Sequence, residues 1–177
     1  MSDIDDLFDT LMRLQRNKRL PPLQQWHPSH AGEIDIRIDR EGNWYHEGVR
    51  IQRQPLVDLF ATILRHEPDG YYLVTPVEKM KIVVEEVPFL AIDLDVRGTG
   101  QAKQLLFSTN VGDYIIASEA NPIYMIGDRP FLHVRDRLEA RIQRSVFYRL
   151  VEEGEEESND LIVYSDGGAF NLGSLVC

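Results

Sequence analysis

The chain has 177 residues, 43% of them hydrophobic, and a formal net charge of -10 from 29 acidic and 19 basic residues. This length and composition argue against a disordered or membrane-embedded chain and suit one domain or two small ones. The acidic balance argues against general nucleic-acid binding and against docking on anionic lipid. A local basic pocket can still bind a small anion, because salt screens distant charges over roughly 8 Å.

The first residues and the cysteine content favour a cytoplasmic protein. The start, MSDIDDLFDTLMRLQRN, has no basic segment ahead of an apolar core, so no signal peptide is expected. No apolar run approaches the length needed to span a bilayer. The single cysteine, Cys177, excludes an internal disulfide and a thiolate metal site. We therefore expect the protein in the cytoplasm of a bacterium-like cell, away from the membrane.

Residues 1–16 are predicted to form an N-terminal helix. Apolar residues recur at helical spacing, namely Ile4, Leu7, Phe8 and Leu11. Ser2 or Asp3 can cap this helix, and acidic residues fill its first turn. The next stretch, NKRLPPLQQWHPSHAG, is expected to be irregular because of its prolines. Leu23 and Trp26 are expected to pin it onto the body of the protein.

A β-β-α-β-β unit is predicted within a first domain at residues 17–86. Alternation with a period of two predicts a strand at 34–38, and NWYHEGVRI returns as a second strand after a turn at 40–43. Pro55 fits the first turn of a helix. The apolar residues of this helix are Leu56, Leu59, Phe60, Ile63 and Leu64. The segments TyrTyrLeuValThr and LysIleValValGlu complete the unit as two strands.

Residues 87–177 are predicted to form a larger, β-rich second domain packed by one helix. Strands are predicted at 89–96, 104–109 and 113–117, followed by a hairpin that turns at Gly127 and Asp128. Asp136 is expected to cap the helix. The apolar residues of this helix are Leu138, Ile142, Val146 and Leu150. LeuIleValTyrSer and AlaPheAsnLeu are predicted to close the chain as a hairpin.

A gapless match at an offset of 87 residues predicts an internal duplication. The match pairs residues of the two hairpins and helices in register: Trp44 with Phe131, Tyr45 with Leu132, His46 with His133, Arg50 with Arg137, Ile51 with Leu138, and Phe60 with Phe147. We therefore expect an α+β protein made of two related domains that meet along an interface near residues 76–88.

Several segments carry a recognisable pattern. They are TyrTyrLeuValThrProValGluLys at 71–79, WYHEG and QPLVDLFATIL before it, ProProLeu at 21–23, and GlyGluIleAspIleArgIle at 32–38. Together they closely resemble the bacterial family known as domain of unknown function 1285, over most of the chain. The resemblance implies a duplicated core with a C-terminal β-roll that resembles a pleckstrin-homology fold. It also implies a nucleotide-like ligand between the domains and a signalling role, with no established activity and no catalytic residues to carry over.

His46 and Glu47 have the residue types of a general base with an orienting carboxylate. Adjacent strand residues point to opposite faces, so we expect that the two do not act as a pair. The second copy keeps the histidine as His133 but has Val134 in place of the glutamate. A structural role within the repeated unit is therefore the favoured interpretation.

The polar run ThrProValGluLys at 75–79 is a stronger candidate, because its counterpart in the second copy is the plain turn SerAspGlyGlyAla. Lys79 with Arg50, Arg53 or Lys81 would supply positive charge for an anion, and Trp44 or Tyr45 a stacking face. An ion pair at a strand end is the alternative interpretation. The candidate ligand-binding residues are Trp44, Tyr45, His46, Arg50, Arg53, Glu78 and Lys79.

Other motifs indicate structure rather than chemistry. Gly98-Thr99-Gly100 lacks the third glycine and the following helix of a dinucleotide fingerprint, so a tight turn is expected. His27 and His30 lack a third metal ligand nearby, so no metal site is predicted. Basic residues on the predicted second helix and the acidic run at 152–157 are expected to form a solvated, charge-compensated face. These basic residues are Arg137, Arg141 and Arg144.

The sequence favours a non-enzymatic sensor or adaptor that holds a small, nucleotide-like anion between two domains, without a cofactor or metal. One alternative is a protein–protein interaction module that needs no ligand. Another is an unrecognised enzyme that uses Glu78 and His46 in acid–base chemistry. The sequence contains no P-loop, nucleophile elbow or HisGluXaaXaaHis motif.

Overall fold

The computed structural model describes residues 3–176, which form two compact units. One unit, the N-terminal domain, contains residues 18–88. The other, the C-terminal domain, combines the N-terminal helix with the chain from Phe89 onward. The helix therefore belongs to the domain that is more distant in sequence. The predicted cap Ser2, the side chains of Asp3, Ile4 and Leu11, and the terminal Cys177 lie outside the described part of the chain.

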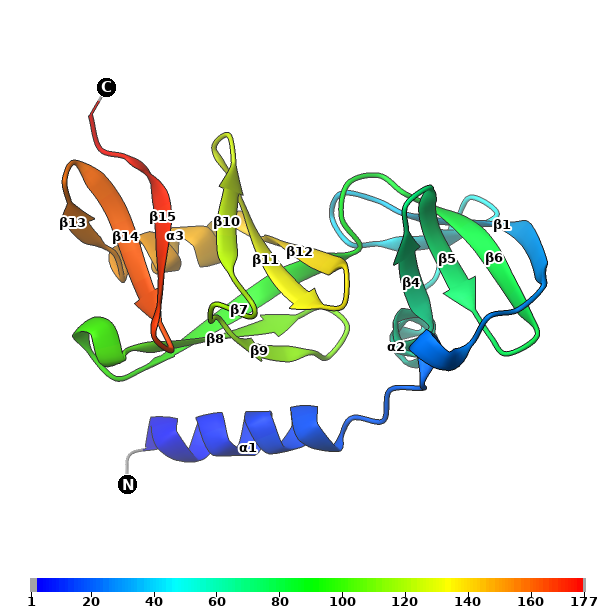
Figure 1. Cartoon of the computed structure of the whole chain (residues 1–177), viewed down its shortest axis with the longest axis horizontal. Coiled ribbons are helices and arrows are strands. Elements are labelled where there is room, and N and C mark those ends of the chain that lie inside the picture. The colour runs from blue at the N-terminus through cyan, green and yellow to red at the C-terminus, as the bar shows by residue number, and fades with distance from the viewer. Residues whose placement is uncertain (1–2, 177) are drawn as a thin grey trace. The chain divides into compact units, whose positions relative to one another are not determined.

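The N-terminal helix α1 (Asp3–Asn17) packs along the strands β7 (Phe89–Arg97) and β9 (Tyr114–Ile116), as Figure 1 shows. Phe8 is fully buried, and the guanidinium carbon of Arg97 lies 4.7 Å from the centroid of its ring. The same guanidinium lies 3.7 Å from a carboxylate oxygen of Asp5 and 3.5 Å from one of Asp9. A buried aromatic and these charges therefore hold α1 in place.

The N-terminal domain is built on a mixed sheet with the strand order β3-β2-β1-β6-β5-β4. Neighbouring strands are antiparallel except for the central pair, β1 and β6, which is parallel. The strands are β1 (His30–Ile38), β2 (Trp44–His46), β3 (Val49–Arg50), β4 (Leu64–Glu67), β5 (Gly70–Val74) and β6 (Glu78–Val84). The helix α2 (Gln54–Thr62) connects β3 to β4, with Pro55 in its first turn as predicted.

Two strands of this domain were missing from the predicted β-β-α-β-β unit. Strand β3 is only two residues long, which is too short to give a periodic pattern. Strand β4 begins at Leu64, which was assigned to the helix, because α2 already ends at Thr62. Leu64 pairs with Leu73 across the sheet and is buried, so an apolar residue at this position fits a strand as well as a helix.

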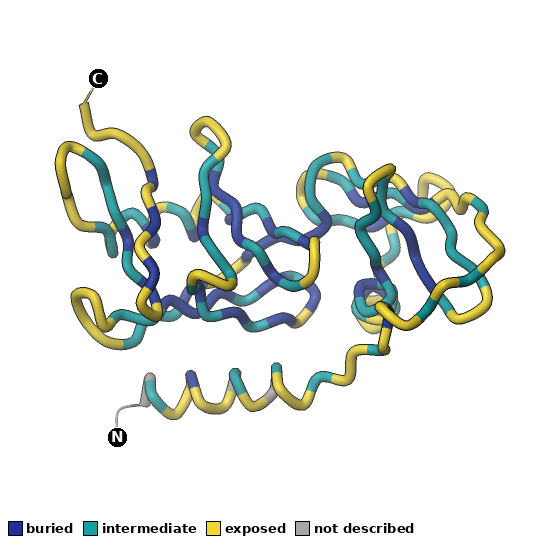
Figure 2. Tube along the Cα trace, in the orientation of Figure 1, coloured by how far each residue is buried: buried dark blue, intermediate teal, exposed yellow. Residues whose placement is uncertain are grey.

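The core of the N-terminal domain lies between α2 and the sheet. It includes Trp44, whose ring stacks on that of Phe60 at a centroid distance of 6.1 Å. The short 3-10 helix η1 (Leu23–Gln25) adds Leu23, which packs with Tyr72 and Val74, and Trp26 lies against the same cluster. The prediction that Leu23 and Trp26 pin the irregular arm onto the body is confirmed. In Figure 2 buried residues follow the strands, whereas the turns are exposed.

The C-terminal domain contains a sheet with the order β10-β11-β12-β7-β8-β9, which curls into a half-barrel. Its further elements are η2 (Gly100–Ala102), β8 (Gln104–Thr109), β10 (Ile123–Ile126), β11 (Arg129–Arg135), β12 (Leu138–Ile142) and α3 (Arg144–Glu152). A smaller sheet follows, formed by β13 (Glu155–Glu157), β14 (Asp160–Ser165) and β15 (Gly168–Ser174). The predicted turn at residues 98–100 is confirmed: Gly98 has a φ of 83°, and an added Cβ would lie 2.9 Å from the carbonyl oxygen of Ala102.

The two larger sheets confirm a duplicated α+β architecture. In each, the first strand lies in parallel beside the sixth, as β1 beside β6 and β7 beside β12, with antiparallel strands on either side. The gapless offset of 87 residues is wrong as an alignment of the two copies, because it pairs β2 with β11, whereas the strand orders of the two sheets pair β2 with β8. The repeated sheet was therefore predicted in outline, but its register was not.

The predicted helix from Asp136 to Leu150 is wrong in its first half. Leu138, Ala140 and Ile142 are buried on one face of strand β12, and α3 starts only at Arg144. Residues four positions apart lie on the same face of a strand, which repeats every two residues, and also on the same face of a helix, which repeats about every 3.6 residues. The spacing of Leu138 and Ile142 therefore did not distinguish a strand from a helix. The predicted basic helical face is also wrong, since Arg137 precedes β12, Arg141 lies on it and Arg144 begins α3. No helix within residues 3–176 is long and apolar enough to cross a membrane.

Candidate functional site

A pocket of about 440 Å³ in the N-terminal domain brings together basic, acidic and histidine side chains. We call it the Lys79 pocket. Its lining residues come from the arm before β1, from β4 and the turn after it, and from β6: Gln24, His27, Pro28, Arg65, Glu67, Pro68 and Lys79. Of the candidates predicted from the sequence, Lys79 lines this pocket.

Strand alternation and the irregular arm together build the Lys79 pocket. Arg65 and Glu67 are two residues apart on β4, so they share one face of the sheet. Arg65 donates hydrogen bonds through one nitrogen to the carbonyl oxygens of Leu23 and Trp26, the second at 2.8 Å. These bonds hold the arm over β4, so the arm forms the opposite wall of the pocket.

Glu67 lies between two cations. Its Oε1 accepts a hydrogen bond from Lys79 Nζ at 2.8 Å, and its Oε2 lies 3.5 Å from a guanidinium nitrogen of Arg65. The exposed fractions of these three side chains are between 16% and 26%, so water screens their two ion pairs less than it screens an ion pair on the surface. Two positive charges face one negative charge, which leaves the cluster with an excess positive charge in an acidic protein.

Tyr72 lies on β5, between β4 and β6. Lys79 Nζ lies 4.6 Å from the centroid of its ring, and Lys81 Nζ lies 6.0 Å from it. The Tyr72 hydroxyl donates to Oδ2 of Asp69 at 2.7 Å. This hydrogen bond is the main reason why the pKa of Tyr72 is raised to about 12, and it lowers the pKa of Asp69. The tyrosine therefore stays neutral and fixed next to the lysine.

The run at 75–79 divides into residues with different roles. Thr75 Oγ1 accepts hydrogen bonds from the backbone N–H groups of Val77 and Glu78, at 3.3 and 3.2 Å, and so shapes the turn between β5 and β6. Glu78 and Lys79 are adjacent on β6 and therefore point to opposite faces of the sheet. Only Lys79 reaches the pocket, and Glu78 is not its partner there.

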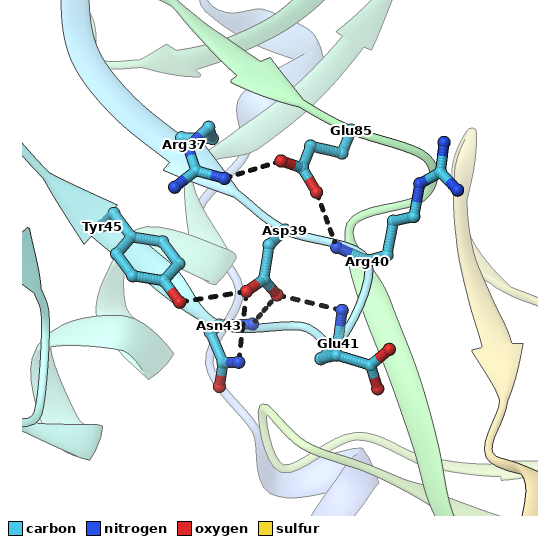
Figure 3. Close-up of polar contacts among 7 residues, drawn as sticks. All are labelled: Arg37, Asp39, Arg40, Glu41, Asn43, Tyr45 and Glu85. Atoms are coloured by element: carbon cyan, nitrogen blue, oxygen red, sulfur yellow. Dashed lines mark hydrogen bonds and ion pairs between the residues drawn. The ribbon is translucent and has the colours of Figure 1, made fainter. Parts of the chain in front are cut away.

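Tyr45, another predicted candidate, belongs to a separate polar network (Figure 3). Its hydroxyl donates to Oδ2 of Asp39 at 3.1 Å, and the guanidinium carbon of Arg37 lies 4.6 Å from its ring centroid. The hydrogen bond to Asp39 is the main cause of the raised pKa of Tyr45. One face of the ring is thus already covered by a cation within the domain.

Asp39 and Glu85 organise the turn after β1. Asp39 accepts hydrogen bonds from the backbone N–H groups of Glu41 and Asn43, both at 2.9 Å, and from the Asn43 amide at 3.2 Å. Burial raises the pKa of Asp39, but these hydrogen bonds and that from Tyr45 outweigh it, so its pKa lies below the usual value. Glu85 accepts from Arg37 at 2.6 Å and from the backbone of Arg40 at 3.1 Å, as Figure 3 shows. The network fixes a turn.

The structure places the other candidates away from the Lys79 pocket. Trp44 is 1% exposed in the core, so its ring offers no stacking face within the domain. Arg50 lies opposite Tyr45 on β3, and Arg53 precedes the first turn of α2 without a side-chain cap. His46 is exposed, at the end of β2.

The expectation that His46 and Glu47 point apart is wrong. Glu47 lies in the turn after β2 with a φ of 50°, so strand alternation does not apply to it. His46 Nε2 lies 3.9 Å from a carboxylate oxygen of Glu47, and both side chains are more than half exposed. Such an exposed pair contributes little to stability.

The register of the sheet separates the predicted residues into two groups. His46 lies opposite Ile36 of β1, whereas Glu78 lies opposite His30 of the same strand. These positions are roughly 20 Å apart along β1 at about 3.3 Å per residue. His46 and Glu78 therefore do not converge on one reacting group.

Arg65, Glu67 and His27 were not predicted as site residues. The alternation of Arg65 and Glu67 before the Pro68-Asp69 turn was a usable signal, but no strand was predicted there, because Leu64 was assigned to the helix and Glu67 to the turn that ends it. His27 was considered only as a metal ligand. The described residues contain no group of three or more His, Cys, Asp or Glu side chains that could hold a metal ion.

Comparison with known proteins gives consistent matches along the chain. Residues 21–87 match the family model described as Domain of unknown function (DUF1285), N-terminal domain, and residues 88–172 match that of the DUF1285 C-terminal domain. A crystal structure of a DUF1285 family protein from Silicibacter pomeroyi DSS-3 is 42% identical, with a TM-score of 0.85, covering 96% of this chain and 95% of that one. A crystal structure of a DUF1285 family protein from Shewanella baltica OS155 is 28% identical, with a TM-score of 0.55. The match covers 66% of this chain and 90% of that one. No curated protein matches the chain.

Proposed function

This chain belongs to the DUF1285 family, and on that premise we propose that it is a non-enzymatic binding protein whose N-terminal domain holds a small anionic ligand in the Lys79 pocket. The observation that carries the proposal is the convergence of Arg65 and Lys79 on the Glu67 carboxylate, in a pocket that His27 also lines. We place this function in the cytoplasm, as a sensor or adaptor that reports the ligand to a partner.

The chemistry of the Lys79 pocket suits an anionic group attached to a compact body. Guanidinium and ammonium groups form charge-assisted hydrogen bonds to phosphate and carboxylate oxygens. The volume of about 440 Å³ lies in the range of small-molecule sites. An anion there would share Lys79 and Arg65 with Glu67, and His27 would add a further hydrogen-bond donor. A nucleotide-like ligand and its location between the two domains stay predictions.

The first experiment is a thermal-shift screen of the full chain with nucleoside mono-, di- and triphosphates and cyclic dinucleotides. A ligand that binds only the folded state raises the melting temperature. We expect at least one of these anions to do so, and Lys79→Ala to abolish the rise. Lys81→Ala is the matched control, because Lys81 lies two residues further on the same strand and face but does not line the pocket.

A loss of the shift in both lysine variants would indicate diffuse attraction by surface charge, and the Lys79 pocket would be rejected as the site. The absence of any shift at millimolar concentration would count against small-anion binding altogether. In that case the hypothesis of an interaction module would gain weight. It predicts a stoichiometric partner in a pull-down that needs no added ligand.

A further inference from the structure

A second pocket, of about 360 Å³, lies in the C-terminal domain and gathers arginine side chains. We call it the arginine pocket. Its charged residues are Asp128, Arg129, Arg141 and Arg144, and its aromatic residues are Phe147 and Tyr148. All of them belong to the C-terminal domain, so this pocket is independent of the Lys79 pocket and of the function proposed for it.

Three elements bring the arginines together. Arg129 begins β11, and its guanidinium carbon lies 5.8 Å from the ring centroid of Phe131, two residues further on the same face. Arg141 lies directly opposite Phe131 on the neighbouring strand β12. Arg144 begins α3 and shares one helical face with Phe147 and Tyr148, at the spacing i, i+3, i+4. Sheet and helix thus each contribute cations to one cavity.

One strand of the N-terminal domain shows that the repeat does not require arginine. By strand order β5 corresponds to β11, and it begins with Gly70 where β11 begins with Arg129. Helix α3 has no counterpart at the same place in the N-terminal domain, since α2 lies between β3 and β4 whereas α3 follows β12. The lining of the pocket itself carries three guanidinium groups and one carboxylate, that of Asp128, so its charge favours an anionic ligand.

Arg144 is available to such a ligand. Its side chain is exposed, and no hydrogen bond or ion pair joins it to another residue that the structure describes. It stands at the start of α3, where Gln143 forms no side-chain cap. The N–H groups of the first helical turn and the positive end of the helix dipole add to the attraction for an anion.

We propose that the arginine pocket binds the phosphate group of a small aromatic phosphomonoester. The planar guanidinium group matches two phosphate oxygens at once, and Arg144 is exposed and able to make such a contact. Tyr148 is 59% exposed and offers a flat face for the aromatic ring of the ligand. Pro130 and Ile142 supply apolar surface beside it. The volume suits one ring with its phosphate.

Calorimetric titration with phenyl phosphate, inorganic phosphate and phenylacetate tests this assignment on the full chain. We expect phenyl phosphate to bind more tightly than inorganic phosphate, and phenylacetate to bind more weakly than phenyl phosphate. Arg144→Gln should weaken both phosphate ligands about tenfold, the loss of one charge-assisted contact. Arg137→Gln is the matched control, since Arg137 precedes the same strand but does not line the pocket.

Tyr148→Ala separates the two parts of the proposal. It should lower the affinity for phenyl phosphate to that for inorganic phosphate and leave inorganic phosphate unaffected. Equal weakening by Arg137→Gln and Arg144→Gln would overturn the site, and so would no binding at millimolar phenyl phosphate. Phenylacetate binding as tightly as phenyl phosphate would overturn the assignment to phosphate. Loss of phenyl phosphate binding in Lys79→Ala but not in Arg144→Gln would assign the phosphate to the Lys79 pocket and overturn this proposal, so failure here is distinguishable from failure of the Lys79 pocket.

Discussion

Gln15 of α1 and Tyr114 of β9 are joined by a hydrogen bond although 99 positions separate them in the sequence. The backbone N–H of Tyr114 donates to the Gln15 side chain at 2.9 Å, and the Gln15 amide lies 3.4 Å from Oδ1 of Asp113, which is fully buried. The first helix thereby completes the C-terminal domain. The family models match the chain only from residue 21 onward, so this helix lies outside the matched segments.

Truncation of Phe8 should destabilise the C-terminal domain. Its ring is fully buried under α1, and removal of a buried aromatic side chain costs about 3–5 kcal/mol. We expect Phe8→Ala to lower the free energy of unfolding of this domain by that amount in a urea titration. Leu7→Ala is the control, because Leu7 is 38% exposed on the same helix. Equal losses in the two variants would show that α1 does not pack through Phe8.

The hydrogen bond between Tyr72 and Asp69 should give stability a dependence on pH at both extremes. The pKa of Tyr72 is raised from 10.0 to about 12 in the folded chain, so the bond stabilises the fold below pH 10.0, and this stabilisation is lost as the pH rises through about 12. The pKa of Asp69 is lowered from 3.8, so its contribution is present above pH 3.8 and is lost as the pH falls through the folded pKa.

Ultraviolet titration of the tyrosines checks this prediction. The difference between the wild type and Tyr72→Phe isolates the titration of Tyr72, which we expect near pH 12. Asp69→Ala should move that titration down toward 10.0 because the acceptor is lost. An unchanged midpoint in Asp69→Ala would contradict the assignment of the shift to this hydrogen bond.

Asp39 should stabilise the N-terminal domain through the turn after β1. Its carboxylate accepts hydrogen bonds from two backbone groups and from the side chains of Asn43 and Tyr45. We expect Asp39→Ala to lower the free energy of unfolding by about 2 kcal/mol and to lower the pKa of Tyr45 toward 10.0. Asp35→Ala, an exposed carboxylate of β1, is the control and should have little effect. Chemical denaturation and ultraviolet titration measure the two effects.

Neutralising Glu67 should lower the stability of the fold and raise its affinity for the anion. In Glu67→Gln the cations Arg65 and Lys79 lose their carboxylate, and the partly buried ion pairs contribute about 1–2 kcal/mol. We expect the melting temperature without ligand to fall, and the shift caused by the best anion of the thermal screen to grow. Glu78→Gln, on the opposite face of β6, should change neither value. A smaller ligand shift in Glu67→Gln would mean that the ligand needs the carboxylate.

The secondary-structure class, most strands and the existence of a duplication could be predicted from the amino-acid sequence. These follow from local periodicity, turn residues and the resemblance of segments such as TyrTyrLeuValThrProValGluLys. The WYHEG stretch shows the limit of that information. Trp44 and His46 have the residue types of a site, but the strand pairing puts one in the core and the other far from Glu78.

Which polar residues meet could not be predicted from the sequence, because it depends on how the strands are ordered in the sheets. Glu67 and Lys79 come together because β5 folds between β4 and β6, and the arginine pocket forms because α3 begins beside the end of β12. Neither contact leaves a local pattern, since both depend on strand order and register. The same holds for α1: its apolar spacing predicted a helix, but not that it packs against β7 and β9.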